Sequence, residues 1–453
     1  MVFCGIDIGT TSTKAVVLDR DGRVIDETTL AAPATGEAYW HEHFCQVLDF
    51  FASRGRLQGE EIVCSVTGQG GSFVLTDEAS HPVGGACSWT ELAEEAIVRD
   101  MVDMFGEAGF YRLTGWPPHG WLAACKLRQR IERKQVPESV RHVATVPDFV
   151  YAQLTGELCT DITSAQITGL ADFQGRRWGR DILAWAGVSE GLLPPIEPGL
   201  GVLKEGLRTR WGKLTLVTGS HDQYAAMEAA GLVKDTSVML GTGTAWVING
   251  RTSRPLFDDR RFRTHPGADL HPDCSGFIVT LWQIGAGFDR LLSRLGVTHA
   301  SLAGLEDSLT DADVPRTCVK VDLDTGAVEP AADAALSVRR YMEWSGSVVA
   351  HALDSCGLSQ GVEKIVVAGG AMSSRLWPQI IAEVCGLTVE AVDCPPFTAY
   401  GAALHARDTL LGPLKPHRFP STAAVRTCTP RHPREYRAWY QDCQKPMVDV
   451  QNS

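Results

Sequence analysis

The segment Phe3-Cys-Gly-Ile-Asp-Ile-Gly-Thr-Thr-Ser-Thr13 decides the fold, because its pattern returns later in the chain as Val238-Met-Leu-Gly-Thr-Gly-Thr-Ala-Trp-Val-Ile248. Each copy is an apolar strand, a Gly-Thr turn and a second strand rich in apolar residues. Such a turn brings glycines, small hydroxyls and free backbone N–H groups together, a combination that can surround phosphate oxygens. The sequence therefore predicts two phosphate-binding loops, of which only the first carries an acid, Asp7, in a position to meet a metal ion.

The spacing of these loops predicts a duplicated architecture. Gly9 and Gly241 are separated by roughly half of the 453 residues, a length that usually forms two domains rather than one. The expected fold is therefore α/β, with two related domains and a cleft between the copies. We place the boundary after residue 232, which gives an N-terminal domain over 1–232 and a C-terminal domain over 233–453.

Composition excludes several classes of partner. The apolar fraction of 44% and the charged fraction of 21% are those of an ordinary folded domain. The formal charge of −12 and the absence of a Lys/Arg stripe argue against nucleic acid or an anionic membrane as partner. No run of 18 apolar residues occurs. We expect a small-molecule ligand whose phosphate site is built locally.

The cysteines predict a reduced environment. There are 13, scattered from Cys4 to Cys443 without any Cys-x-x-Cys pair. This usage speaks against both a zinc site and a disulfide framework. The first residues also lack a basic region followed by a long apolar stretch. The expected location is the cytoplasm.

A glycine-rich strand end marks a candidate ligand site in the first half. The run Glu61-Ile-Val-Cys-Ser-Val-Thr67 reads as a buried strand and leads into Gly68-Gln-Gly-Gly71. Helical spacing of apolar residues follows over 91–105, 121–131 and 147–154. Ligands commonly bind at such strand ends.

Asp222 is the candidate for acid–base chemistry. It follows the strand-like run 214–218 and begins a small-residue segment that reads as a helix. A helix N-terminus favours an ionised carboxylate, so Asp222 would be a proton acceptor at neutral pH. By position alone, a simple N-cap is the commoner role. His221 reads as a hydrogen-bonded neighbour.

The second half contains a further strand–glycine–helix arrangement. Lys364-Ile-Val-Val-Ala368 reads as a buried strand, continues into Gly369-Gly-Ala-Met-Ser-Ser-Arg375, and is followed by a helix over 376–384. This order can bring backbone N–H groups and a helix N-terminus against a nucleotide. A close helix–strand crossing explains the two glycines equally well.

Taken in order, these segments resemble the FGGY family of carbohydrate kinases, within the actin-like ATPase (ribonuclease H-like) fold. The resemblance runs nearly end to end. It is carried by the segments Asp7-Ile-Gly-Thr-Thr-Ser-Thr-Lys14, Leu154-Thr-Gly-Glu-Leu-Cys-Thr-Asp161, Asp222-Gln223, Leu240-Gly-Thr-Gly-Thr244, Gly369-Gly370, Gly401-Ala-Ala403 and Glu435-Tyr-Arg-Ala-Trp-Tyr440.

The resemblance implies transfer of the γ-phosphoryl group of ATP to a hydroxyl of a sugar, ketose or polyol. Asp222 would be the general base, and Asp7 would hold Mg²⁺ through water. ATP would be held by Gly9, Thr10, Thr11, Gly241, Thr242, Gly243, Gly369, Gly370 and Ser373. The acceptor would be bound by Gln69, Gly70, Gly71, Trp89, Glu91, Asp222 and Gln223.

The acceptor segments depart from the family pattern. Xylulokinases carry Gln-Met-His-Gly where this chain has Gln69-Gly-Gly-Ser72, and the Trp-x-Asp element appears as Trp89-Thr-Glu91. The Gln-Arg-Glu element of glycerol kinases is absent. The loss of two side chains predicts either a larger pocket near Gly70 and Gly71 or fewer polar contacts there. Candidates for stacking on a sugar face are Trp89, Trp116, Trp121 and Trp282.

Two other functions share these motifs. One is a different actin-like ATPase, which would lack a base on the acceptor side. The other is a sugar or nucleotide sensor without turnover, which the altered acceptor segment leaves open. For the kinase we expect domain closure about a hinge near residues 230–236, because water must be excluded from the transferring phosphoryl group. A homodimer is one possible assembly.

Overall fold

The computed structural model describes residues 1–33, 38–281, 283–307, 309, 318–330, 332–394, 396–414, 419–420 and 422–443. By contacts, the chain forms two compact units that are not contiguous in sequence. Unit 1 comprises Met1–Gly231, Ser253–Gly276 and Pro396–Ser421, and unit 2 comprises Leu232–Thr252, Phe277–Pro395 and Thr422–Ser453. The first unit therefore takes two segments from the predicted C-terminal half.

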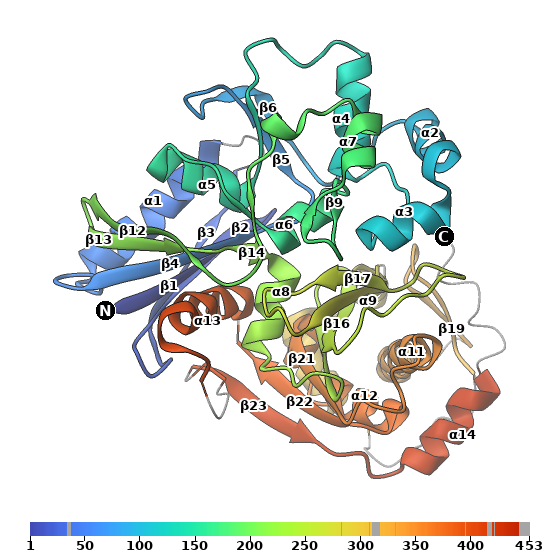
Figure 1. Ribbon diagram of the computed structural model, residues 1–453. Helices are drawn as coiled ribbons and strands as arrows, with labels where there is room; N and C mark the ends of the chain where they lie inside the picture. Colours follow the sequence, from blue (N-terminus) through green and yellow to red (C-terminus); the bar gives the residue numbers. More distant parts are fainter. Residues whose placement is uncertain are drawn as a thin grey trace. The chain divides into compact units, whose positions relative to one another are not determined.

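Unit 1 is built on a mixed sheet. Its strands are neighbours in the order β12-β13-β4-β1-β2-β3, with β14 also paired to β4 (Figure 1). The pairs β1–β2, β2–β3 and β12–β13 are antiparallel, whereas β1, β13 and β14 run parallel to β4. The strands span Val2–Ile8 (β1), Ser12–Leu18 (β2), Val24–Ala31 (β3), Glu61–Gly68 (β4), Val202–Thr209 (β12), Gly212–Val217 (β13) and Ser220–His221 (β14).

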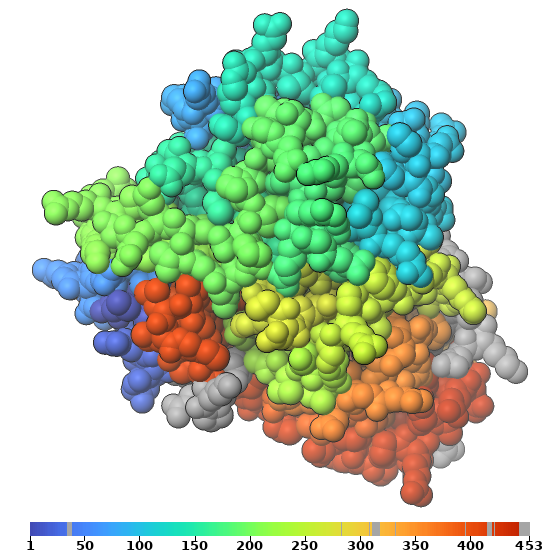
Figure 2. Space-filling view, viewed as in Figure 1, coloured from blue at the N-terminus to red at the C-terminus, as the bar shows by residue number. Residues whose placement is uncertain are grey.

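Alternation along β1 explains how this sheet is covered. Val2, Cys4, Ile6 and Ile8 belong to an apolar core with residues of helices α1 (Ala38–Ser53) and α5 (Val146–Thr155). Successive side chains of a strand point to opposite faces, so the residues between them face the other side. There Gly5 meets helix α13 (Phe397–Leu411), which also packs on α8 (Asp222–Ala229). Figure 2 shows the orange-red surface of α13 beside the dark blue surface of the first strands. Asp7 shares the α13 face of β1.

The remaining elements of unit 1 include a three-stranded sheet of order β6-β5-β7 and the two-stranded pairs β9–β10 and β8–β11. These and the smaller elements are β5 (Phe73–Thr76), β6 (Pro82–Cys87), β7 (His142–Thr145), β8 (Thr160–Asp161), β9 (Ala171–Asp172), β10 (Arg177–Trp178), β11 (Ile196–Glu197), β17 (His265–Ala268), α2 (Glu95–Phe105), α3 (Glu107–Thr114), α4 (Ala123–Glu132), α6 (Ile162–Ile167), α7 (Arg180–Ala186) and the 3₁₀ turn η1 (Glu190–Leu192).

Unit 2 repeats the strand order of unit 1. Strands β16, β15, β21 and β22 are neighbours in this order, with β16–β15 antiparallel and β15–β21–β22 parallel, as are β2, β1, β4 and β13 in unit 1. This shared topology confirms the predicted duplication. The elements are β15 (Ser237–Thr242), β16 (Trp246–Thr252), β18 (Ser275–Leu281), β19 (Lys320–Asp322), β20 (Ala327–Glu329), β21 (Lys364–Gly369), β22 (Thr388–Asp393), β23 (Ala424–Cys428), α9 (Ile284–Leu295), α10 (His299–Glu306), α11 (Ala334–Ser355), α12 (Trp377–Cys385), α14 (Pro433–Cys443) and the 3₁₀ turn η2 (Gly370–Ser373).

Some details differ from the sequence predictions. The apolar spacing of residues 337–356 predicts a long helix, but helix α11 begins earlier, at Ala334. The Asp333 carboxylate caps it there by accepting from Leu336 N at 2.8 Å. A disulfide joins Cys318 to Cys443, whereas the sequence predicts free cysteines only. These two cysteines are 125 residues apart, so their spacing in the sequence gave no indication of the bond. The other cysteines are free thiols. Within the described ranges, no helix is both long and apolar enough to span a bilayer.

Candidate active site

The candidate site of unit 1 lies where three parallel strands end. In the register of the sheet, Ile8 of β1 and His221 of β14 both pair with Gly68 of β4. Because the carboxyl ends of parallel strands share one edge of a sheet, the residues that follow them are brought together. The sheet thereby places Asp7, the turn that begins at Gln69, and Asp222 at a single edge.

Asp222 is the first residue of helix α8, and the N-cap is His221. The N-cap position is therefore one residue before Asp222, and the interpretation of Asp222 as a simple N-cap is wrong. The Asp222 side chain is 30% exposed, and its Oδ1 lies 3.1 Å from His221 Nε2 and 3.2 Å from Gln223 Nε2. His221 is itself buried, and its backbone N donates to Thr163 Oγ1 at 2.8 Å. His221, itself held by Thr163, thus contacts one carboxylate oxygen of Asp222, whose side chain remains partly exposed.

Asp7 is a partly buried carboxyl group close to a second acid. Burial, together with the negative charge of Asp222, raises the pKa of Asp7 to about 7, and the charge of Lys14 opposes this shift. Lys14 lies opposite Asp7 in the β1–β2 register. A divalent cation would offset both unfavourable effects, so this donor set fits Mg²⁺, which commonly uses one or two carboxylates and keeps several waters. Among the described residues, no group of three or more His, Cys, Asp or Glu side chains could hold a metal.

Thr10 connects the first phosphate loop to the acceptor segments. Its Oγ1 donates to Gln69 Oε1 at 2.6 Å and accepts from Trp89 Nε1 at 3.1 Å. Three residues predicted from separate stretches are therefore in contact. Gly9 closes the loop, its N donating to Ser12 O at 3.0 Å, and Thr11 is exposed.

The two glycines of the acceptor turn differ in the space beside them. A Cβ at Gly70 would lie 2.5 Å from the imidazole of His221 and 2.9 Å from Ile167 Cγ1. A Cβ at Gly71 would meet Trp89 at 3.4 Å and Trp121 at 3.5 Å. The side chains of His221 and Ile167 fill the space beside Gly70, so the predicted larger pocket is not found at that position, whereas a Cβ at Gly71 would make only ordinary van der Waals contacts. Gly71 has φ +78°, a conformation that favours glycine.

Glu91 is engaged with its own loop. Its Oε1 accepts from Ser88 N at 2.9 Å, while Oε2 lies 3.8 Å from Arg130. The side chain is nevertheless 52% exposed, so lone pairs remain accessible to a ligand. Glu91 is thus close to the acceptor segments and also stabilises the turn that carries Trp89.

Of the tryptophans predicted to stack on a sugar, Trp116 and Trp121 are in contact with each other. Trp116 is buried, its ring 5.1 Å from that of Trp121 and stacked on His265 at 4.5 Å. Trp121 and Trp89 are only half-buried. Trp116 is therefore a supporting residue, and Trp89 and Trp121 are the rings available for a ligand. Trp282 lies outside the described residues.

The second phosphate loop and the Gly369-Gly370 segment meet in unit 2. Thr242 and Gly369 are paired in the β15–β21 register. Thr242 Oγ1 donates to Ala368 O at 2.9 Å and accepts from Ala371 N at 3.0 Å. The hydroxyl thus fixes the turn rather than remaining free. A Cβ at Gly369 would lie 2.9 Å from Thr242 O, and one at Gly370 3.2 Å from it, so the backbones approach closely.

Two further features of unit 2 complete this loop. Ser373 ends the 3₁₀ turn and donates to Gly370 O at 2.8 Å. Next to Gly243, helix α9 begins so close that a Cβ at Gly285 would overlap Gly243 O, and Ala286 N donates to Thr244 O at 3.1 Å. The apolar spacing of residues 282–292 predicts a helix here, but it does not indicate that the N-terminus of the helix meets the loop. Gly241 has open space beside its Cα, because a Cβ at this position would come no closer than 3.8 Å to any atom.

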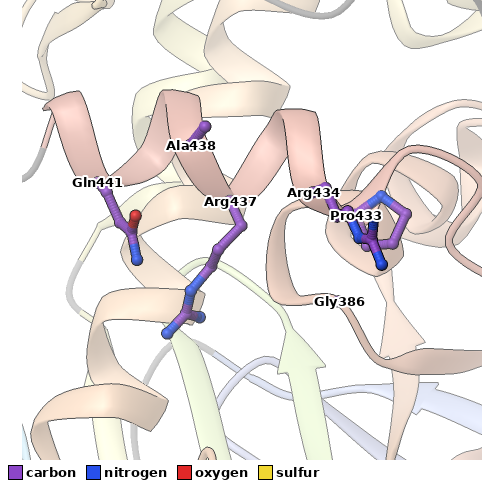
Figure 3. Close-up of a pocket in the computed structure, with 6 residues that line it drawn as sticks. All are labelled: Gly386, Pro433, Arg434, Arg437, Ala438 and Gln441. Carbon is purple, nitrogen blue, oxygen red and sulfur yellow. The ribbon is translucent and has the colours of Figure 1, made fainter.

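A separate hollow lies on unit 2 beneath α14 (Figure 3). It has a volume of about 400 Å³ and is lined by Gly386, Pro433, Arg434, Arg437, Ala438 and Gln441. Arg437 is paired with Asp354 at 3.2 Å. None of the predicted site residues lines this hollow.

The two units and the site define the actin-like ATPase fold. Known structures agree: the xylulose kinase from Rhodospirillum rubrum has a TM-score of 0.82 at 21% identity, with 98% of this chain and 97% of that chain covered. The FGGY family of carbohydrate kinases matches through its N-terminal domain over residues 2–228 and its C-terminal domain over 331–407.

The chain belongs to the FGGY family of carbohydrate kinases. Its relatives include a xylulose kinase from Streptomyces coelicolor, 27% identical with 90% of this chain and 88% of the relative covered. A glycerol kinase from Rhodospirillum rubrum is also 27% identical, with 88% of each chain covered. Membership identifies the chain as a phosphotransferase with an alcohol acceptor and supports ATP-dependent phosphorylation of a sugar or polyol.

Proposed function

We propose that this kinase transfers the γ-phosphoryl group of ATP to a hydroxyl of a sugar or polyol, with Asp222 as the general base. The position of Asp222 supports the proposal. Asp222 is the first residue of helix α8 and lies at the edge of the sheet where β1, β4 and β14 end. Its carboxylate is partly open to solvent. Its Oδ1 is held by His221 and Gln223. Asp222 would accept the proton of the attacking hydroxyl.

Asp7 is the residue that would hold Mg²⁺. When bound, the cation would neutralise phosphate charge as the phosphoryl group is transferred. The chain's own contribution is to keep Asp7 partly buried on the face of β1 shared with α13, opposite Lys14.

The nucleotide and the acceptor would use different sets of residues. Gly9 and Thr11 of unit 1, and the loop Gly241–Gly243 with Gly369, Gly370 and Ser373 of unit 2, would bind ATP mainly through backbone N–H groups. This is supported by the Thr242 hydroxyl being committed to the turn. Gln69, Trp89, Glu91 and Gln223 would bind the acceptor.

We further propose that the acceptor presents a C–H-rich face to Trp89 and Trp121. A Cβ at Gly71, where the xylulokinase pattern has histidine, would lie 3.4 Å from Trp89 Cβ and 3.5 Å from the Trp121 ring. Both tryptophans are half-buried. Aromatic faces favour apolar surface, including the C–H bonds of a sugar ring. The acceptor would therefore form few polar contacts at Gly71.

The test is ATP-dependent ADP release over a panel of ketoses, aldonates and polyols with Mg²⁺, run beside Asp222→Asn. A positioned general base contributes about 10²- to 10⁴-fold in rate, so kcat should fall by at least about 100-fold while ATP binding is retained. Asp181→Asn is the matched control, because Asp181 is an exposed acid in the first turn of helix α7.

One acceptor that is strongly preferred, with turnover lost only in Asp222→Asn, would support the kinase and identify its substrate. ADP release that is indifferent to every acceptor would favour another ATPase. Acceptor or nucleotide binding without any product would favour a sensor. Either of the last two results would overturn the proposed function.

A further inference from the structure

Lys126 is a buried lysine that the proposed chemistry does not use. It lies on helix α4 within the buried run Ala123–Leu127, and only 3% of its surface is exposed. Its Nζ donates to two backbone carbonyls, Ser88 O at 2.7 Å and Gly71 O at 3.2 Å. The ammonium group thus links two loops that are separated by 17 residues in sequence.

Burial of this ammonium group is unfavourable and calls for a compensating role. Burial lowers the pKa of Lys126, although Cys87 and Glu91 favour its charged form. The charged group also lies 5.7 Å from the centre of the Phe73 ring. Removing an ammonium from water is costly unless it is hydrogen-bonded, and an apolar side chain of similar volume would avoid that cost. An apolar side chain could not make the two hydrogen bonds that Lys126 Nζ donates to Gly71 O and Ser88 O.

The two linked loops carry the acceptor segments. Gly71 belongs to the turn that begins at Gln69, and Ser88 immediately precedes Trp89. The loops are also joined by a bond from Trp89 N to Ser72 Oγ at 3.0 Å, and by Thr10, which contacts both Gln69 and Trp89. Lys126 approaches the same junction from the buried side, at the carbonyls directly beside these residues.

We propose that Lys126 is a positioning residue that sets the spacing between the Gln69–Ser72 turn and the Ser88–Glu91 loop, and thereby determines affinity for the acceptor. The proposal rests on the proposed function, in which these loops bind the acceptor. Within the described residues, Lys126 donates only to carbonyls of the two acceptor segments, whereas the phosphate loop of unit 2 is held by the Thr242 hydroxyl, so the contribution of Lys126 is selective for the acceptor. A lysine with only a structural role would instead change stability without discriminating between the two substrates.

The test compares Lys126→Met with the parent enzyme in the full-length chain. Methionine keeps much of the side-chain volume but cannot donate to Gly71 O or Ser88 O. KM for the preferred acceptor should rise at least about tenfold, while KM for ATP, and kcat at saturating acceptor, stay within about threefold. Lys126→Arg, which retains N–H donors, should recover part of the lost affinity. Lys213→Met, at a half-exposed lysine paired with Glu61, is the matched control and should change neither constant.

Hydrogen–deuterium exchange gives a second readout that needs no turnover. In Lys126→Met, backbone amides of residues 69–72 and 88–91 should exchange at least several times faster, with those of β4 unchanged. An acceptor KM within threefold of the parent, or equal losses for ATP and acceptor, would overturn the proposal, as would unchanged exchange in both loops. If the parent shows no acceptor-dependent turnover, the proposed function fails, whereas the exchange measurement still decides whether Lys126 holds the loops.

Discussion

At the scale of single residues, the space beside Gly70 explains why this position has no side chain. The imidazole of His221 occupies it, and the same imidazole holds Asp222 Oδ1. A methyl group at position 70 would therefore act on the proposed base through His221. The glycine and the histidine form one steric unit, although they are 151 residues apart.

We predict that Gly70→Ala lowers kcat/KM at least about tenfold, because its Cβ would come within 2.5 Å of the His221 ring and displace it. The measurement is steady-state kinetics with the preferred acceptor. The double variant Gly70→Ala/His221→Ala should lose no more than His221→Ala alone, since the clash has been removed. Strictly additive losses would show that the two residues act independently.

At the scale of elements, the crossing of α13 with α8 depends on a small residue. A Cβ at Gly401 would overlap Ala225 O and come within 3.1 Å of Ala229 N. Because Asp222 begins α8, this crossing also fixes the start of the helix that carries the proposed base. The segment Gly401-Ala-Ala403, noted in the sequence as a family feature, is thus a packing surface.

We expect Gly401→Ala to destabilise unit 1 by about 1–3 kcal/mol, the usual range for overpacking. The thermal unfolding midpoint measures this change. Gly109→Ala in helix α3 is the control, because its Cβ would meet no atom within 4 Å. That exposed substitution should instead stabilise by up to about 1 kcal/mol, since alanine is the better helix former. Equal effects of the two substitutions would contradict the close crossing.

Helix α5 makes the stability of unit 1 depend on pH through Asp148. This buried carboxyl accepts from Thr145 N at 2.9 Å, and burial raises its pKa to about 7. The unfolded group loses its proton near pH 4, whereas the folded group keeps it up to about pH 7. The folded state therefore binds the extra proton between these values, and the free energy of unfolding falls as pH rises through this window.

Asp148→Asn should remove this fall, because the amide can still accept from Thr145 N and does not titrate. The difference in unfolding free energy between variant and parent should grow by on the order of 2–4 kcal/mol from pH 4 to pH 7. Denaturant unfolding at several pH values measures it. A difference that stays constant over the window would show that the Asp148 carboxyl has the same pKa in the folded and unfolded protein.

Local patterns were sufficient to predict the strands and glycine turns that carry the site. The repeated Gly-Thr turn predicted the duplicated sheets, and the position of Asp222 at the start of a helix was predicted correctly. Contacts between segments that are distant in the sequence could not be predicted from these local patterns. The ring of His221 filling the space at Gly70, and the Thr242 hydroxyl binding Ala368 O, depend on packing between segments more than 100 residues apart.

At the scale of the whole molecule, the order of the chain and the compact units do not coincide. Residues 253–276 and 396–421 belong to unit 1, although they follow the predicted boundary at 232. The second of these segments supplies α13, which packs against β1 and α8. The first strand is thus completed by a helix encoded almost 400 residues later. A single boundary predicted from the spacing of motifs cannot show that segments of the C-terminal half belong to unit 1.

We therefore predict that a fragment of residues 1–232 does not fold cooperatively, because the Gly5 face of β1 and the Gly401 contact surface of α8 remain uncovered. A chain that joins 1–231, 253–276 and 396–421 through flexible linkers restores α13 and should show a single cooperative thermal transition by circular dichroism. The same joined chain with Gly401→Val is the control and should lose that transition, since valine at this crossing keeps the helix from packing on α8. A cooperative, monomeric transition of the 1–232 fragment would show that α13 is dispensable to the first sheet, and that unit 1 is specified by the N-terminal half alone.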